Sequence, residues 1–245
     1  MPDRKALVVV PTYNEKDNIG TIISKIFDQD VSRYVSAMEI LVVDDNSPDG
    51  TAALVKNIRE TNSAVHLLER PAKQGLGKAY VAGFTFALQH DYDYILEMDA
   101  DLSHDPVYLP DFFEKIQSSD LVIGSRYLHG VNVINWPLSR LLISYFGNLY
   151  ARMVTGFPVR DATSGYKCFR ASVLRQIDLT KVSASGYSFQ IEMNYRIWKL
   201  GFKLCETSII FYDRQLGQSK MSANIVKEGL LLVWKLRIKA MFGQL

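Results

Sequence analysis

Several features are scarce in this 245-residue sequence. No run of about 18 apolar residues occurs, so a membrane-spanning helix is not expected. Only two cysteines are present, Cys168 and Cys205, without metal-ligand spacing, which favours reduced thiols in a cytoplasmic chain. The net charge of +2 argues against a protein dedicated to nucleic acid. The amino-terminal residues MPDRKALVVVP lead directly into a predicted strand, so we expect no secretory signal.

The composition is that of a globular protein that can bury a sizeable core. Hydrophobic residues make up 48% of the chain and charged residues 22%. The length fits one large domain, or one domain with a small appendage. Because no membrane-spanning helix is expected, the protein would have to reach a lipid substrate from the membrane surface.

Short apolar β-rich runs alternate with helical patterns through the first half of the chain. The patterns predict strands at 6–10, 39–43, 65–68, 94–98 and 120–123, and helices near 18–27, 51–60, 77–89 and 106–118. Such alternation predicts an α/β fold with a mostly parallel sheet and helices on both faces. Ligands of such sheets bind outside the carboxyl ends of the strands.

Polar clusters follow the first two predicted strands. Pro11, Tyr13 and Glu15 follow the first, where a flat ring and an acid could face a ligand or simply form a capped turn. Asp44 and Asp45 follow the second, where a carboxylate could accept hydrogen bonds from a base or a ribose. The residues after them, 47–50, have ordinary turn chemistry.

A third cluster follows the strand predicted at 94–98. Residues i and i+2 of an extended chain point the same way, so Asp99 and Asp101 can face one point beyond the strand. Paired carboxylates beside a diphosphate suit Mg²⁺ or Mn²⁺. The alternative is an acidic loop before a capped helix, since Asp105-Pro106 is a good helix start.

Taken in order, these clusters resemble glycosyltransferase family 2. The matching segments are VVVPTYNE (8–15), VVDDNSPDGT (42–51), GLGKAY (75–80), MDADLSHDP (98–106) and GSRY (124–127). Later segments resemble the branch of this family that acts on dolichyl or polyprenyl phosphate: RDATSGYKCFR (160–170), GYSFQIEM (186–193) and DRQLGQSKMS (213–222). The resemblance covers nearly the whole chain.

The resemblance implies a GT-A fold and inverting, metal-dependent transfer of mannose from GDP-mannose to dolichyl or polyprenyl phosphate, with release of GDP. It implies one domain, 1–245, with a nucleotide-sugar half (1–125), an acceptor half with a mobile loop (126–222) and a carboxyl-terminal interfacial helix (223–245). The rivals are a glucosyltransferase that uses UDP-glucose or GDP-glucose on the same lipid, a polysaccharide-extending transferase, and a nucleotide-sugar-binding module without catalysis.

The resemblance also implies the donor site. Its nucleoside pocket would be lined by Pro11, Tyr13, Glu15, Val42 and Asp44, with Asp45, Asp99 and Ala100 also near the donor. Asp101, with Asp99 nearby, would hold the metal that stabilises the departing diphosphate. Ser103 stands where relatives often have a glutamine that helps to hold the metal, so a water could intervene there.

Three cations are expected around the phosphates. Arg126 could contact the donor or acceptor phosphate, or be a structurally paired charge. Arg214 and Lys220 match the cations of a loop that closes over the diphosphate in the family, which would exclude water and strengthen electrostatic contacts. An exposed basic loop is the alternative reading of that segment.

Arg140 and Ser144 lie four residues apart on a helix predicted at 137–155, and they match acceptor-phosphate contacts of the family. Gln190 is likewise expected at the acceptor. The sequence assigns no step to four further residues that should border the sugar or acceptor pocket: Asp161, Thr163, Ser164 and Glu192.

Two segments could lie on a bilayer. Residues 131–157 are rich in aliphatic and aromatic side chains, and residues 225–242 combine apolar side chains and Trp234 with four basic residues. A basic helix with aromatic anchors suits an anionic membrane surface. We expect peripheral attachment to the cytoplasmic face of a membrane, with a core helix or an interface with a small membrane-anchoring subunit as the alternatives.

Overall fold

The computed structural model describes residues 3–182, 186–213 and 223–243, and its first half has the alternation that the sequence predicts. The elements in order are β1 (Lys5–Thr12), α1 (Lys16–Phe27), β2 (Ala37–Asp44), α2 (Thr51–Thr61), β3 (Val65–Glu69), α3 (Leu76–Gln89), β4 (Tyr94–Glu97), a 3₁₀ turn (Pro106–Tyr108), α4 (Leu109–Ile116) and β5 (Leu121–Ser125). Each predicted strand and helix is present, with ends that differ by a few residues.

The second half is less regular. Its elements are β6 (Val133–Ile134), α5 (Leu138–Thr155), β7 (Lys167–Arg170), α6 (Ala171–Leu174), a 3₁₀ turn (Leu179–Lys181), α7 (Gly186–Lys199), β8 (Leu204–Ser208), β9 (Phe211–Tyr212) and α8 (Ala223–Met241). Of these, α5 matches the helix predicted at 137–155.

The central sheet has seven strands in the order β3-β2-β1-β4-β7-β5-β8. Only β7 runs antiparallel to its neighbours β4 and β5, and β8 is again parallel to β5. The short strands β6 and β9 form a separate parallel pair. The expected α/β fold with a mostly parallel sheet is therefore confirmed.

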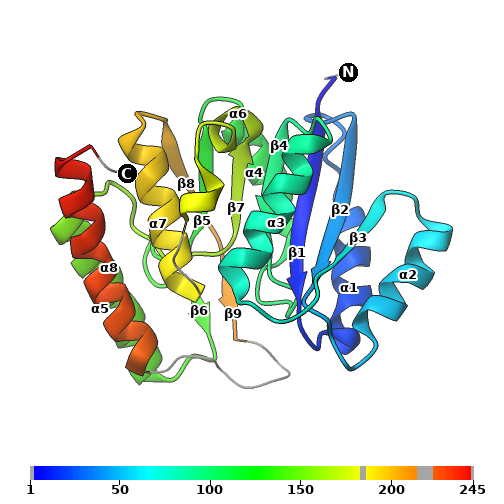
Figure 1. The fold of residues 1–245 in the computed structure, drawn as a ribbon, viewed down its shortest axis with the longest axis horizontal. Helices are drawn as coiled ribbons and strands as arrows, with labels where there is room; N and C mark the ends of the chain where they lie inside the picture. The colour runs from blue at the N-terminus through cyan, green and yellow to red at the C-terminus, as the bar shows by residue number, and fades with distance from the viewer. Residues whose placement is uncertain (1–2, 183–185, 214–222, 244–245) are drawn as a thin grey trace.

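Helices cover both faces of the sheet (Figure 1). Leu7 and Val9 of β1 point into the core beneath α3, α6 and α7, whereas Val8 and Val10 point into the core beneath α1, α2 and α4. Strands buried on both faces read as continuous apolar runs, which explains the sequence of β1. The carboxyl ends of the parallel strands lie at the lower edge in Figure 1.

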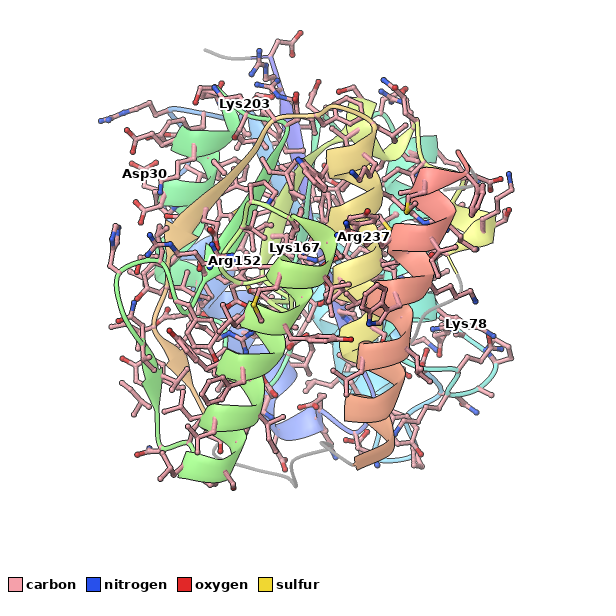
Figure 2. All side chains as sticks on the ribbon, turned by 90° about the vertical axis from the view of Figure 1, so that its left-hand side faces the viewer. Asp30, Lys78, Arg152, Lys167, Lys203 and Arg237 are labelled. Atoms are coloured by element: carbon pink, nitrogen blue, oxygen red, sulfur yellow. The ribbon has the colours of Figure 1, made fainter. Side chains whose placement is uncertain are left out.

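Helices α5 and α8 pack side by side at one end of the molecule (Figure 2). Tyr150 of α5 donates a hydrogen bond from its hydroxyl to the carbonyl of Leu230 at 3.3 Å, and Arg237 of α8 donates to the carbonyl of Val154. Among the residues that the structure describes, no helix has both the length and the apolar character needed to cross a bilayer.

Candidate functional site

A solvent-open cleft lies at the carboxyl edge of the sheet, over β1 and β4. The chain leaves β1 toward β2 on one side and returns to β4 on the other, and ligands of open α/β sheets bind at such a point. The cleft encloses about 1460 Å³ including its mouth. Its wall contains Pro11, Tyr13, Glu15, Asp45, Lys73, Gly75, Asp99, Ala100, Asp101, His104, Arg126, Thr163, Ser164, Gly165, Gln190 and Phe211, among others.

The end of β1 supplies an aromatic surface. The ammonium of Lys73 lies 3.8 Å from the centre of the Tyr13 ring, so a cation already covers one face of that ring. The next residue, Asn14, has a φ of 60°, a left-handed conformation that Asn tolerates, and its N–H donates to Ser47. This contact ties the first cluster to the second.

The two aspartates at the end of β2, Asp44 within it and Asp45 just after it, have different roles. Asp44 is buried and its carboxylate accepts hydrogen bonds from the Thr12 hydroxyl at 2.8 Å and from the Ser47 hydroxyl at 2.6 Å, so it holds the turn together. Asp45 lines the cleft and pairs with Arg70 at 2.7 Å. Val42 is fully buried within β2. The donor-binding roles expected of Val42 and Asp44 stay predictions.

The carboxylate of Asp99 lies at the end of β4, where Tyr80 of α3 donates a hydrogen bond to it at 3.1 Å. Burial, and after it the charge of Asp99, raise the pKa of the Tyr80 hydroxyl well above its ordinary value. The hydroxyl therefore remains a donor at all ordinary pH values, and it fixes the carboxylate from the side of α3.

Asp101 is held by a tight turn. Both the N–H and the hydroxyl of Ser103 donate to Oδ1 of Asp101, at 3.1 Å and 2.5 Å. Leu102 between them has a φ of 62°, which is unfavourable for a leucine and is typical of positions where strain is retained at a functional site. Ser103 is buried, and its hydroxyl is directed at Asp101. Direct metal ligation by Ser103 stays a prediction.

The residues present fit a divalent ion shared with a substrate. Within the described part of the chain, no three His, Cys, Asp or Glu side chains form a metal cage. Mg²⁺, however, is usually held by one or two carboxylates together with substrate phosphates and water. Asp99 and Asp101 both line the cleft, so they offer that smaller set of oxygen ligands.

His104 is buried beside these carboxylates, stacked on Tyr166 at 5.1 Å between ring centres. The backbone N–H of Asp99 donates to its Nδ1 at 3.1 Å. Burial lowers the pKa of His104 in spite of the neighbouring charge of Asp99. The imidazole is therefore neutral, with its proton on Nε2.

Arg126 is a buried cation with a buried counter-charge. Its guanidinium makes two parallel hydrogen bonds to Asp161, both of 2.7 Å, and a third of 2.7 Å to the Thr163 hydroxyl. Burial opposes ionisation of Asp161, but the guanidinium holds the pKa of that carboxyl below its ordinary value. The structure thus gives Asp161 a partner that the sequence did not identify.

Arg140 and Ser144 lie on one face of α5, as expected. Arg140 is buried, its guanidinium lies 4.1 Å from the centre of the Trp136 ring, and it donates to Asp213 at 2.7 Å. Ser144 accepts a hydrogen bond from the Tyr127 hydroxyl at 2.8 Å.

Beneath the cleft lies a buried ion pair. Lys167 of β7 and Glu97 of β4 are fully buried with 3.8 Å between Nζ and Oε2, and Lys167 also donates to Oε1 of Gln190 on α7. Burial raises the pKa of Glu97 to about 7 and lowers that of Lys167 to about 8, and each charge opposes the shift of the other.

An apolar groove runs from the cleft between α5, α7 and α8. Arg126 and Thr163 line both the cleft and the groove, so the two are continuous. The rest of the groove is lined by Trp136, Ile143, Ser144, Gly147, Tyr150, Ala151, Ser188, Ile191, Gly229, Leu230 and Val233.

The structure brings the first and third clusters together with Asp45, Arg126 and Gln190 around one cleft. Arg214 and Lys220 lie outside the described residues. Sequence reasoning gave no role to Arg70, Tyr80, His104 or Lys167. The signal for the last three was present, since Tyr80, His104 and Lys167 each lie in a segment that matches the family, whereas Arg70 lies outside those segments.

The family model described as Glycosyl transferase family 2 matches residues 7–178. The chain is 43% identical to the undecaprenyl-phosphate mannosyltransferase of Micrococcus luteus, over 94% of this chain and 92% of that protein. It is 41% identical to the polyprenol monophosphomannose synthase of Mycolicibacterium smegmatis, over 96% and 89%.

Among solved structures, the fold is similar to that of glucosyl-3-phosphoglycerate synthase from Mycobacterium tuberculosis in complex with UDP. The TM-score is 0.66 at 17% identity, over 96% of this chain and 80% of that one. A second structure of that synthase, with Mn²⁺, UDP and glucosyl-3-phosphoglycerate, has a TM-score of 0.62 at 18% identity, over 98% and 80%. At such identity the similarity concerns the fold alone.

Proposed function

The chain belongs to glycosyl transferase family 2, and from that premise we propose that it transfers mannose from GDP-mannose to a polyprenyl phosphate and releases GDP. The single observation that carries this proposal is the continuity of a polar cleft with an apolar groove through Arg126 and Thr163. A donor with charged phosphates suits the cleft, and a prenyl chain suits the groove. The two bacterial relatives, whose names specify mannose transfer to such lipids, support the same reaction.

The donor half of the cleft supplies groups for each part of a nucleotide sugar. Tyr13 and Asp45 lie where a base and ribose would be expected, after β1 and β2. Asp99 and Asp101 lie after β4. A divalent ion held by Asp101 and Asp99, Mg²⁺ or Mn²⁺, would supply Lewis-acid stabilisation of the departing diphosphate.

The acceptor needs little activation, because its phosphate is already a charged nucleophile at neutral pH. One phosphate oxygen forms a bond to C1 of the mannose while the bond from C1 to the diphosphate breaks, which inverts C1 and leaves GDP. The protein's task is to hold that oxygen in line with the leaving group. Ser144 lines the groove, and Arg140 lies over the ring of Trp136, which lines it too. An arriving phosphate would share or displace the contact between Arg140 and Asp213.

Arg214 and Lys220 remain part of the proposal as the cations of a closing loop, although they lie outside the described residues. Their expected role is to add positive charge over the diphosphate and to exclude water from it.

The exposed faces of α5 and α8 support a peripheral position on a membrane, with the cytoplasmic face as the proposed side. Leu138, Phe146 and Met153 of α5 and Leu231 and Trp234 of α8 are all more than half exposed. Apolar side chains that gather on one face mark an interaction surface. A bilayer would bring the prenyl chain to the groove between the same two helices. A small anchoring subunit on this face stays a prediction.

The proposal is tested by incubating the purified protein with Mn²⁺ or Mg²⁺, a polyprenyl phosphate in detergent, and GDP-mannose or UDP-glucose. We expect mannosyl lipid and GDP from the first donor only, and no release of GDP without lipid phosphate. Transfer from UDP-glucose with none from GDP-mannose would overturn the choice of donor. If the protein bound GDP-mannose but transferred no sugar under any condition, the result would favour a nucleotide-sugar-binding module without catalysis.

A further inference from the structure

Lys167, Glu97 and Gln190 form a buried polar group directly behind the cleft. All three side chains are at most 1% exposed, and they come from three different elements, β7, β4 and α7. In Figure 2, Lys167 lies within the outline of the molecule and not at its edge. Burying Lys167 and Glu97 costs stability, because a buried ion pair often contributes less to the free energy of unfolding than apolar residues of the same volume.

The ammonium of Lys167 determines which way the Gln190 amide faces. An ammonium has three donors and no acceptor, so only Oε1 of Gln190 can be directed at it. The amide nitrogen Nε2 is then turned away from Lys167. Nε2 is fully buried and has no hydrogen bond of ordinary geometry among the described residues. Burial raises the pKa of Glu97, but a contact from the Gln190 amide opposes that rise, so Nε2 lies near the Glu97 carboxylate and one of its two donors is left for the cleft.

Nε2 of Gln190 borders a space at the cleft wall that exists because residue 165 is a glycine. A Cβ at Gly165 would lie 3.5 Å from Nε2, 3.5 Å from Cε1 of His104 and 3.9 Å from Oδ1 of Asp99. None of these distances is a clash, so an alanine methyl at residue 165 would fit in ordinary contact. Gly165, Gln190 and Asp99 all line the cleft, so a ligand at this part of the wall would lie near both the amide donor and the Asp99 carboxylate.

We propose that Nε2 of Gln190 donates a hydrogen bond to a hydroxyl oxygen of the transferred hexose, and that Lys167, balanced by Glu97, is the positioning residue that keeps this donor facing the cleft. The inference rests on the proposed function, since it takes the group beside the diphosphate to be a hexose. The hexose is the part of a nucleotide sugar that adjoins the diphosphate, and Asp99, the proposed metal ligand beside the diphosphate, lines the same cleft as Gln190.

The direct test is binding, measured by calorimetry with Mn²⁺ for two ligands: the nucleotide sugar that the wild type uses, and the matching nucleoside diphosphate, which lacks the hexose. Gln190→Met removes the donor and keeps the length of the side chain. Gly165→Ala fills the space beside the donor without a clash. Each variant should bind the nucleotide sugar about tenfold more weakly, the worth of one hydrogen bond, and the diphosphate with wild-type affinity.

The role of Lys167 is tested with the charge-balanced double variant Lys167→Met/Glu97→Gln, which leaves no buried charge uncompensated. It should weaken binding of the nucleotide sugar by a similar factor, and it should have no further effect when Gln190→Met is already present, because both changes act on one donor. Phe169→Leu is the matched control on β7, because it makes a buried side chain two residues from Lys167 smaller. It should lower Tm but leave the ratio of the two affinities, for the nucleotide sugar and for the nucleoside diphosphate, as in the wild type.

Wild-type affinity of Gln190→Met for the nucleotide sugar would overturn the proposal, as would equal losses for both ligands. Additive effects of Lys167→Met/Glu97→Gln and Gln190→Met would reduce Lys167 to a structural role. If the double variant fails to fold, the two single variants still decide the role of the donor. Because binding is the readout, the result is independent of whether mannose is transferred to a lipid.

Discussion

At the scale of single residues, charged groups of the site are held in place by partners from distant parts of the chain. Asp45 is paired with Arg70, Arg126 with Asp161 and Arg140 with Asp213. Such pairing fixes the geometry of a charge before a substrate arrives, so little reorganisation is needed at the moment of reaction.

Asp101 is the residue on which the proposed chemistry depends most. Asp101→Ala should lower kcat by at least about a hundredfold, the order expected when charge stabilisation at the leaving group is lost. Tm without ligand should fall as well, because the buried Ser103 loses the acceptor of two hydrogen bonds, so the loss of activity is compared at a temperature where the variant is folded. The measurement is the rate of GDP release with Mn²⁺ and lipid phosphate, together with the rise in Tm that GDP and Mn²⁺ produce. A wild-type rate would remove the metal hypothesis.

The Asp161–Arg126 pair predicts a pH dependence of stability. Asp161→Asn leaves a buried guanidinium without its counter-charge and should cost about 3–5 kcal/mol of unfolding free energy. Because the pKa of Asp161 is lowered in the folded state, its contribution is complete above the unfolded pKa of about 3.9 and is lost as the pH falls below it.

The measurement for this pair is urea unfolding of wild type and Asp161→Asn between pH 7 and pH 3. The difference between them should be largest at neutral pH and should shrink at the acid end. A difference that grows toward low pH would show that the pair contributes through something other than charge.

At the scale of elements, the site depends on how closely α3 approaches β1, since α3 carries Tyr80 to Asp99. Gly83 makes this approach possible, because a Cβ there would lie 2.4 Å from Cγ1 of Val9. The carboxyl end of β1 and the amino end of α3 both border the cleft, so a shift of α3 would be transmitted to the donor site.

Gly83→Ala should therefore destabilise the protein by about 1–3 kcal/mol, the usual cost of overpacking a core. The matched control is Gly20→Ala in α1, where a Cβ would meet nothing within 4 Å. That change should stabilise by about 0.5–1 kcal/mol, because alanine restricts the unfolded chain. Both are measured by denaturant unfolding, and equal effects of the two substitutions would contradict the packing argument.

At the scale of the whole molecule, the polar cleft is continuous with the apolar groove between α5, α7 and α8, and exposed apolar side chains of α5 and α8, such as Ile143 and Leu230, line that groove. The arrangement allows a substrate with a charged head and an apolar tail to remain partly in a membrane while its head reaches the cleft. It also predicts that binding to a membrane and access of the acceptor depend on the same two helices.

Phe146→Ser/Trp234→Ser should weaken binding to anionic vesicles by about tenfold or more, since two large apolar side chains no longer enter the interface. Both side chains are more than half exposed, so Tm should be unchanged. Val107→Ser, at a similarly exposed apolar residue away from these helices, is the control and should bind as wild type. Vesicle flotation measures the effect, and unchanged flotation of the double variant would assign this face to a protein partner.

Local patterns predicted the first half of the fold well. The strands β1, β2, β4 and β5 are largely buried, the edge strand β3 is partly buried, and each helix has an apolar face, so periodicity carries most of the information. The short strands β6, β7, β8 and β9 and the helix α7 were not predicted. In particular, β7 has four residues and runs antiparallel between two strands that precede it in sequence, a pairing that no local pattern indicates.

The sequence by itself determined the alternating α/β order, the family and the acidic residues at the strand ends, because these depend on residues close together in the chain. Only the tertiary structure decided which charges are paired, that Asp44 faces inward while Asp45 lines the cleft, and that Lys167 orients Gln190. These depend on contacts between residues far apart in sequence, and burial determines whether a side chain binds a ligand or holds the protein together.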